Sequence, residues 1–169
     1  MITLGLSDRA GRRVVLHEVN DENWRAVADV APLDDQRRYV PALAARYLLL
    51  SWREGIWNSM AVCAEDTVVG HVMWGRDEDG SYWLGGMVID GTEQGKGVGR
   101  AAVRTLMEWL AQRESCRELR LSYHPDNAVA ARLYVSLGFQ PTADSSGDEV
   151  VAALSVLDGR SKALNSPSP

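Results

Sequence analysis

The sequence predicts a mixed α/β domain in which an antiparallel meander leads through one helical crossover to a parallel strand. Three segments of strand-like composition, 57–65, 67–74 and 82–90, are joined by short turns, which favour antiparallel pairing. The apolar spacing then changes to a helical period over 97–112, and an alternating strand pattern follows at 118–123. A sheet that combines a meander with one crossover is mixed and not doubly wound.

The elements before the meander are short. Residues 14–19 have the composition of a strand, and the Asn-Asp pair that follows them can cap a helix that Pro32 ends. Residues 34–53 have a helical pattern, but Pro41 inside it requires a break or a kink. We therefore expect two short helices in this stretch.

The elements after the crossover close the sheet. Residues 125–127 provide caps for a further helix, and Gly138 ends it as the C′ residue. Two more strands are expected, one from Phe139 onward and one at 149–156. The predicted order of elements is β-α-α-β-β-β-α-β-α-β-β.

Length and composition fit one soluble domain. The chain has 169 residues, of which 46% are hydrophobic and 24% charged, as in an ordinary globular protein. We expect this domain at 1–157, with 1–12 as a polar lead-in and 158–169 as a disordered tail. No apolar run approaches the roughly 20 residues of a membrane helix, so we expect no membrane span.

Charge and cysteine content exclude further classes. The formal net charge is −5 and the basic residues form only short pairs, which argues against nucleic-acid binding and suits cationic small molecules better. Cys63 and Cys116 lack the spacing of metal ligands, so we expect no metal site. The start of the sequence has no targeting pattern, which favours a reduced, cytoplasmic protein.

The most specific segment is the strand, loop and helix start at 88–100, with the sequence VIDGTEQGKGVGR. Gly95, Gly97 and Gly99 permit backbone angles at which successive N–H groups converge on one anion. The free N–H groups at the helix start and the helix dipole stabilise such an anion. The segment therefore predicts a phosphate-binding loop.

Other interpretations of this loop fit less well. A Walker A loop ends in Gly-Lys-Ser/Thr, which is absent. The dinucleotide pattern G-x-G-x-x-A runs from Gly97 to Ala102, with Glu118 at a suitable distance, but it should follow its strand directly and open a series of parallel βαβ units. Here a meander comes first, and six residues separate Asp90 from Gly97. A glycine-rich turn without a ligand is the remaining alternative.

Two linked motifs resemble those of the Gcn5-related N-acetyltransferase (GNAT) superfamily. The first is Gln94-x-x-Gly97-x-Gly99, and the second is Asn127-x-x-Ala130-x-x-Leu133-Tyr134-x-x-x-Gly138-Phe139. The resemblance implies that the protein is an N-acetyltransferase. It also implies a mixed, mostly antiparallel sheet of about six or seven strands, which is splayed where acetyl-CoA binds and is flanked by about four helices. It also implies direct acetyl transfer to an amine, without a covalent enzyme intermediate.

The resemblance assigns roles to particular residues. Tyr134 would be the general acid that protonates the departing CoA thiolate, although a Tyr at this helical position also suits the core. Asn127 would contact the CoA arm, with helix capping as its alternative role. The residues expected to bind acetyl-CoA are Met87, Val88, Ile89, Gln94, Gly95, Lys96, Gly97, Val98, Gly99, Arg100, Asn127, Ala130 and Tyr134.

The whole pattern has Trp83-Leu84 at the start of its strand, QGKG in the loop, and RLY and Gly-Phe-Gln in the last helix and at its exit. This pattern resembles the bacterial spermine/spermidine (diamine) acetyltransferase branch, which implies an acidic pocket for a small cationic amine. Carboxylates and Trp faces both attract cations, so the expected pocket residues are Asp35, Glu65, Trp74 and Trp83, with Trp52 and Trp57 as further walls. Other acidic residues available there are Asp34, Glu54, Asp148 and Glu149.

The general base and the acceptor have several alternatives. The strand at 82–90 has no carboxylate before Asp90, so a base would act through water, with Glu65, His71 and His124 as candidates. An amine-bearing antibiotic or a peptide amine is a second possible acceptor, and a non-catalytic acyl-CoA-binding module is a third interpretation. The resemblance also implies a homodimer.

Overall fold

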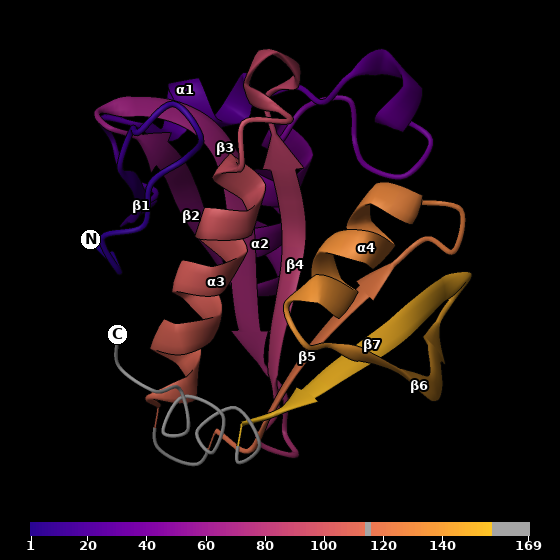
Figure 1. Ribbon diagram of the computed structural model, residues 1–169. Coiled ribbons are helices and arrows are strands. Elements are labelled where there is room, and N and C mark those ends of the chain that lie inside the picture. Colours follow the sequence, from indigo (N-terminus) through magenta and orange to yellow (C-terminus); the bar gives the residue numbers. More distant parts are fainter. Residues whose placement is uncertain (114–115, 157–169) are drawn as a thin grey trace.

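The computed structural model describes residues 1–113 and 116–156, and its centre is a seven-stranded sheet in the order β1-β2-β3-β4-β5-β7-β6 (Figure 1). Only β4 and β5 run parallel, and all other neighbours are antiparallel. The strands are β1 (Val14–Glu18), β2 (Trp57–Ala64), β3 (Thr67–Arg76), β4 (Tyr82–Ile89), β5 (Glu118–Tyr123), β6 (Gln140–Ser146) and β7 (Glu149–Ser155). The predicted mixed sheet is confirmed.

In the part of the chain that the structure describes, four α-helices cover the two faces of this sheet. They are α1 (Trp24–Ala28), α2 (Ala45–Glu54), α3 (Val98–Ala111) and α4 (Ala128–Ser136), with short 3₁₀ turns at Asp34–Gln36 and Gly91–Glu93. Helices α3 and α4 lie on one face and α1 and α2 on the other (Figure 1). None of these helices is long and apolar enough to cross a membrane, as far as the described residues go.

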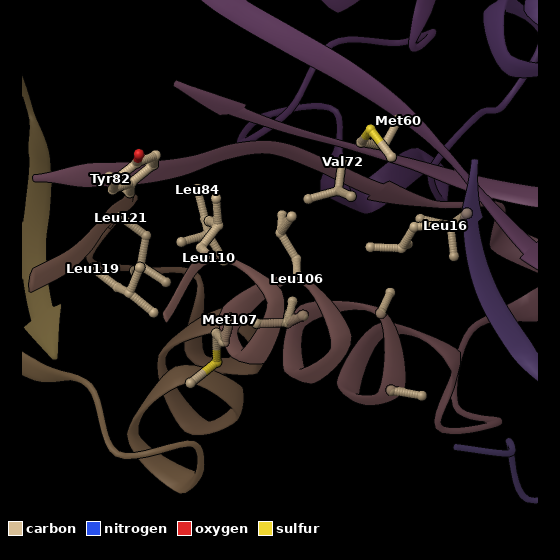
Figure 2. Packing of buried hydrophobic residues seen from close by; sticks show 14 of the residues in the cluster. Leu16, Met60, Val72, Tyr82, Leu84, Leu106, Met107, Leu110, Leu119 and Leu121 are labelled. Carbon is tan, nitrogen blue, oxygen red and sulfur yellow. The ribbon is translucent and has the colours of Figure 1, made fainter. Parts of the chain in front are cut away.

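Helix α3 supplies the larger core. Its apolar stripe places Leu106 and Leu110 fully out of solvent against Val72 and Leu84 of the sheet (Figure 2). Burial of a Leu side chain contributes about 1.5–3 kcal/mol, while Arg104 and the exposed outer face stay in water. This packing fixes the start of α3, which carries the predicted phosphate loop, against the sheet.

The stretch before β2 has less helix than predicted. Only the turn at 34–36 and the helix at 45–54 are helical within 34–53, in agreement with a break around Pro41. Helix α1 is also short and begins after Asn23, because the Asn20 side chain accepts hydrogen bonds from the backbone N–H groups ahead of the helix and forms a turn there.

The first residues are more than a lead-in. Ile2 bridges to Leu16 and Ser7 to Arg13, and the Asp8 side chain is fully buried. This segment therefore folds onto the domain, beside the loop that precedes α3. The predicted tail at 158–169 lies outside the described residues.

Strands β4 and β5 separate along their length. They pair only from Tyr82 to Leu84 of β4, opposite Leu119 to Leu121 of β5. Beyond Leu84 the register of β4 against β3 shifts, and Gly86 adopts a left-handed conformation with φ of 57°. The strand bends there, and the two parallel strands diverge (Figure 1).

Candidate active site

A cleft of about 1170 Å³ opens where β4 and β5 diverge. Its walls come from β4, β5, the start of α3, helix α4 and the chain before α2. Of the residues expected to bind acetyl-CoA, only Lys96 is absent from its lining. The structure thus brings both sequence motifs to one cavity.

The phosphate loop forms one end of the cleft. Gly95 and Gly97 have φ values of 73° and 89°, which side chains other than glycine rarely adopt. Gly97 is the N-cap of α3, and no side chain caps the helix. The first N–H groups of an α-helix have no acceptor within the helix, and Val98, Gly99 and Arg100 of this turn line the cleft, so this cradle suits a pyrophosphate group.

The Gln94 side chain positions the loop from behind. Its Nε2 donates to the Ile89 carbonyl at 2.9 Å, and its amide pairs with that of Gln36 at 2.7 and 2.8 Å. Gln94 therefore ties the loop to the end of β4 and to the turn before α2. The glutamine of the first motif therefore anchors the start of the loop to β4 and to Gln36.

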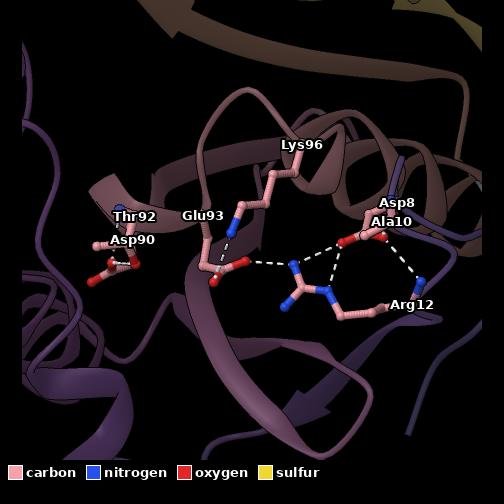
Figure 3. A network of polar contacts seen from close by, with 7 residues as sticks. All are labelled: Asp8, Ala10, Arg12, Asp90, Thr92, Glu93 and Lys96. Carbon is pink, nitrogen blue, oxygen red and sulfur yellow. Dashed lines mark hydrogen bonds and ion pairs between the residues drawn. The ribbon is translucent and has the colours of Figure 1, made fainter.

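An ionic network joins the N-terminal segment to the same loop (Figure 3). Arg12 binds the buried Asp8 carboxylate at 2.7 Å and also Glu93, while Lys96 binds Glu93 at 3.1 Å. The hydrogen bond from Arg12 lowers the pKa of Glu93 and keeps it ionised. Lys96 thus faces this network, which explains its absence from the cleft lining.

Arg9 is a cleft residue that the sequence did not reveal. Its backbone N–H donates to the Lys96 carbonyl at 2.7 Å, and its Nη1 donates to the Gly95 carbonyl at 3.0 Å. Among the described residues no carboxylate pairs with it, so its charge stays available to an anion in the cleft. Arg9 lies 86 positions from Gly95, and no local pattern links the two.

Tyr134 faces the middle of the cleft from α4. Its ring contacts Tyr123 and Phe139, with centroids 5.8 and 6.2 Å apart. Burial raises the pKa of Tyr134, with smaller contributions from Tyr47 and Glu149, so the hydroxyl stays protonated at neutral pH. Tyr134 thus packs on the core and also reaches the cleft.

Asn127 likewise combines two roles. Its side chain accepts the Ala130 N–H at 3.1 Å and caps α4, and Asn127 also lines the cleft. Of the three candidate bases, only His124 lies in the cleft lining. His71 is fully buried behind β4, and both of its ring nitrogens are hydrogen bonded.

The expected acceptor residues are divided by the structure. Trp83 lines the cleft, whereas Asp35, Glu65 and Trp74 do not. Trp74 packs against Trp109, with ring centroids 5.3 Å apart, because alternation along β3 directs it to the α3 face. Glu65 lies in the β2–β3 turn and accepts the Arg13 N–H at 2.6 Å, and Asp35 lies exposed outside the lining.

Other residues line the cleft on the acceptor side, namely Tyr47, Trp57 and Glu149. The Ser122 hydroxyl donates to a Glu149 carboxylate oxygen at 2.5 Å. Burial raises the pKa of Tyr47 to about 12, and the Glu149 charge adds to that rise. The Glu149 charge thus raises the pKa of Tyr47 and also that of Tyr134.

Solved structures of acetyltransferases share this fold. The structure of Mycobacterium smegmatis RimJ in complex with CoA-disulfide superposes with a TM-score of 0.71 at 16% identity, covering 90% of this chain and 86% of that chain. A GNAT-family acetyltransferase from Bacillus anthracis gives a TM-score of 0.69 at 15% identity, covering 93% and 99%.

Sequence comparison identifies the family. The spermine/spermidine N(1)-acetyltransferase of Bacillus subtilis (strain 168) is 32% identical over 130 residues, which cover 72% of this chain and 84% of that protein. The model of the acetyltransferase (GNAT) family matches residues 14–139. The chain therefore belongs to the GNAT family and is an N-acetyltransferase that uses acetyl-CoA.

Proposed function

We propose that this N-acetyltransferase transfers the acetyl group to a primary amine of a small, polyamine-like cation. The observation that carries the proposal is Glu149, a half-buried carboxylate in the cleft that no cation neutralises among the described residues. The name of the similar B. subtilis protein, a spermine/spermidine N(1)-acetyltransferase, supports the same acceptor class.

Among the carboxylates of the cleft, Glu149 is the one that best suits a bound cation. Four carboxylates line the cleft, and Asp8 and Glu93 are both paired with Arg12 at the phosphate end. Asp77 is exposed to solvent beyond β3. Glu149 accepts one hydrogen bond from a neutral hydroxyl, so an ammonium group would complete its contacts with a charge-assisted pair.

Aromatic faces extend this acceptor end. A Cβ at Gly75 or Gly85 would lie 3.3 Å from the Trp57 ring, so these two glycines make room for the indole over β3 and β4. The Trp57 Nε1 donates to Glu54 at 3.1 Å, which fixes the orientation of the ring. Trp57 and Trp83 thereby offer π faces to the methylene and ammonium groups of a polyamine.

In the proposed reaction, different parts of the cleft bind the phosphates, bind the pantetheine arm and protonate the sulfur. The first turn of α3 and Arg9 hold the phosphates, and the β4 backbone from Met87 to Ile89 binds the pantetheine arm. Acetyl-CoA supplies the thioester, an N–C bond forms to the neutral amine as the C–S bond breaks, and Tyr134 donates its proton to the sulfur. Before the attack, water that enters the open cleft takes one proton from the substrate ammonium group to give the neutral amine. After the N–C bond has formed, the nitrogen loses a second proton through water, which restores the Tyr134 hydroxyl.

Free-thiol release from acetyl-CoA tests the acceptor. We expect release with spermidine and spermine, and none with aminoglycosides or peptides. Release with an antibiotic or a peptide and not with spermidine would overturn the proposed acceptor. No release with any amine, despite CoA binding, would indicate a non-catalytic acyl-CoA-binding module.

The homodimer, the cytoplasmic location and the lack of nucleic-acid binding stay predictions. Strand β6 lies at the sheet edge with all of its residues exposed, which leaves its backbone free to pair with another chain. Sedimentation velocity distinguishes a monomer from a dimer.

A further inference from the structure

His71 lies at the centre of a buried polar chain behind β4. Its Nδ1 is 2.7 Å from the Gly86 carbonyl oxygen, and its Nε2 is 2.9 Å from the Ser59 hydroxyl. Ser59 in turn lies 2.7 Å from the hydroxyl of Ser51 on α2. The Tyr47 ring stacks on the imidazole, with centroids 5.6 Å apart and planes 6° from parallel.

The hydrogen bonds determine the tautomer of His71. A carbonyl oxygen only accepts, so Nδ1 carries the proton that binds Gly86. Burial lowers the pKa of His71 to about 4, so the ring is neutral and Nε2 accepts from the Ser59 hydroxyl. The chain therefore runs in one direction, from Ser59 through the imidazole to the Gly86 carbonyl.

The bond to Gly86 orients the next peptide group. Gly86 and Met87 form the bulge in β4, between the pairs His71–Val88 and Met73–Gly85. The peptide is planar and trans, so the Met87 N–H points away from the imidazole that the Gly86 carbonyl binds. Met87 itself lines the cleft.

Glycine at position 86 is required for this approach. A Cβ there would lie 3.1 Å from the imidazole Cε1 and 3.0 Å from the Met73 side chain, and the residue has a positive φ. The bulge and the imidazole therefore fit each other, and neither forms in the same way without its partner.

We infer that His71 is a positioning residue, which holds the Gly86 carbonyl so that the Met87 N–H faces the acetyl carbonyl of the donor. The inference rests on the acetyl transfer proposed above and holds for any acceptor amine. The Met87 N–H then stabilises the negative charge that develops on the carbonyl oxygen. His71 is no general base, because it lies outside the cleft lining and its Nε2 is occupied by Ser59.

Two matched substitutions test the role of the Nδ1 donor. His71→Asn retains an N–H donor at the place of Nδ1, whereas His71→Gln moves the donor to the place of Nε2. We expect His71→Gln to lower kcat by about 10- to 100-fold, His71→Asn to stay near the wild-type value, and both to bind CoA with unchanged affinity in calorimetry. Equal kcat values in the two variants, or a loss confined to CoA affinity, would overturn the inference.

A spectroscopic measurement separates this inference from the acceptor. In ¹H–¹⁵N spectra the Met87 amide proton should shift downfield with acetyl-CoA and not with CoA. The shift should persist in His71→Asn and vanish in His71→Gln, even if no tested amine supports turnover. A Met87 signal that responds equally to both ligands would contradict the proposed orientation, whereas a wild-type protein without turnover would contradict only the proposed function.

Discussion

The two ends of the cleft are built in different ways. The proposed phosphate end is a contiguous loop and helix start, which includes Gly95 to Gly99. The thioester and acceptor end combines β2, β3, β4, β5, β7 and α4, and its hydrogen bonds join residues such as Ser122 on β5 and Glu149 on β7. The geometry of the phosphate end therefore depends mainly on backbone conformation. The geometry of the acceptor end depends on which strands pair and in which register.

The largest expected effect is a loss of CoA affinity on substitution in the phosphate loop. Gly97→Val places a β-branched side chain at φ of 89° and beside Arg9, so we expect CoA affinity to fall by more than about 100-fold. Isothermal titration with CoA measures the loss. Gly80→Val is the matched control, since Gly80 has φ of 86° in a turn outside the cleft lining. An equal loss of CoA affinity in the control would show that backbone strain alone acts.

The next prediction concerns how the free energy of unfolding depends on pH through His71, which is buried behind β4. The pKa of His71 is about 4 in the folded protein against 6.5 as its ordinary value, so the folded state binds fewer protons between these limits. The free energy of unfolding therefore keeps its full value above pH 6.5 and falls by about 3 kcal/mol as the pH drops to 4. Urea unfolding at several pH values should show a shallower loss in His71→Asn; an unchanged slope would contradict a neutral buried imidazole.

Tyr134 tests the chemistry at the middle of the cleft. Tyr134→Phe retains the contacts with Tyr123 and Phe139 but removes the proton donor. We expect kcat to fall about 100-fold with CoA affinity unchanged. Steady-state kinetics together with CoA titration separate the two quantities. A kcat equal to that of the wild type would leave Tyr134 with a packing role alone.

A smaller effect is expected at the acceptor end. Glu149→Gln keeps the side-chain shape and a partner for Ser122 but removes the charge, so the KM of spermidine should rise about tenfold while the KM of acetyl-CoA stays constant. Glu108→Gln removes a carboxylate from the exposed face of α3 and serves as the control. If both variants raise the KM of spermidine equally, the overall charge of the protein attracts the acceptor and Glu149 has no special part.

The contrast between the ends also explains what the sequence could reveal. The order of the strands, the crossover and the loop with its helix were predictable, because apolar periodicity and glycine spacing are local properties. The capping by Asn127 was predictable for the same reason. Glu65 and Trp74 were expected at the acceptor pocket, but strand alternation and the β2–β3 turn direct them elsewhere.

Two of the contacts that the sequence did not reveal join neighbouring strands of the sheet. His71 meets Gly86 only because β4 bulges opposite β3, and Glu149 meets Ser122 only because β7 pairs with β5. Periodicity identifies the elements and leaves open which neighbours they choose and in which register. One signal was present for Glu149, since it was among the acidic residues available near the acceptor side, but the sequence did not single it out.

The smallest expected effect refines the comparison, because Arg9 adds a tertiary contact to the phosphate end, as Gln36 and Arg12 do. Arg9→Met removes a charge that faces the cleft and a hydrogen bond to Gly95, and should raise the KM of acetyl-CoA about fivefold. Acetyl donors without phosphates should show no difference between Arg9→Met and the wild type, because they cannot use the guanidinium. Arg13→Met, an exposed change in the same segment, is the control. If Arg9→Met also raises the KM of donors without phosphates, Arg9 acts on the conformation of the loop, and the backbone of α3 binds the phosphates without it.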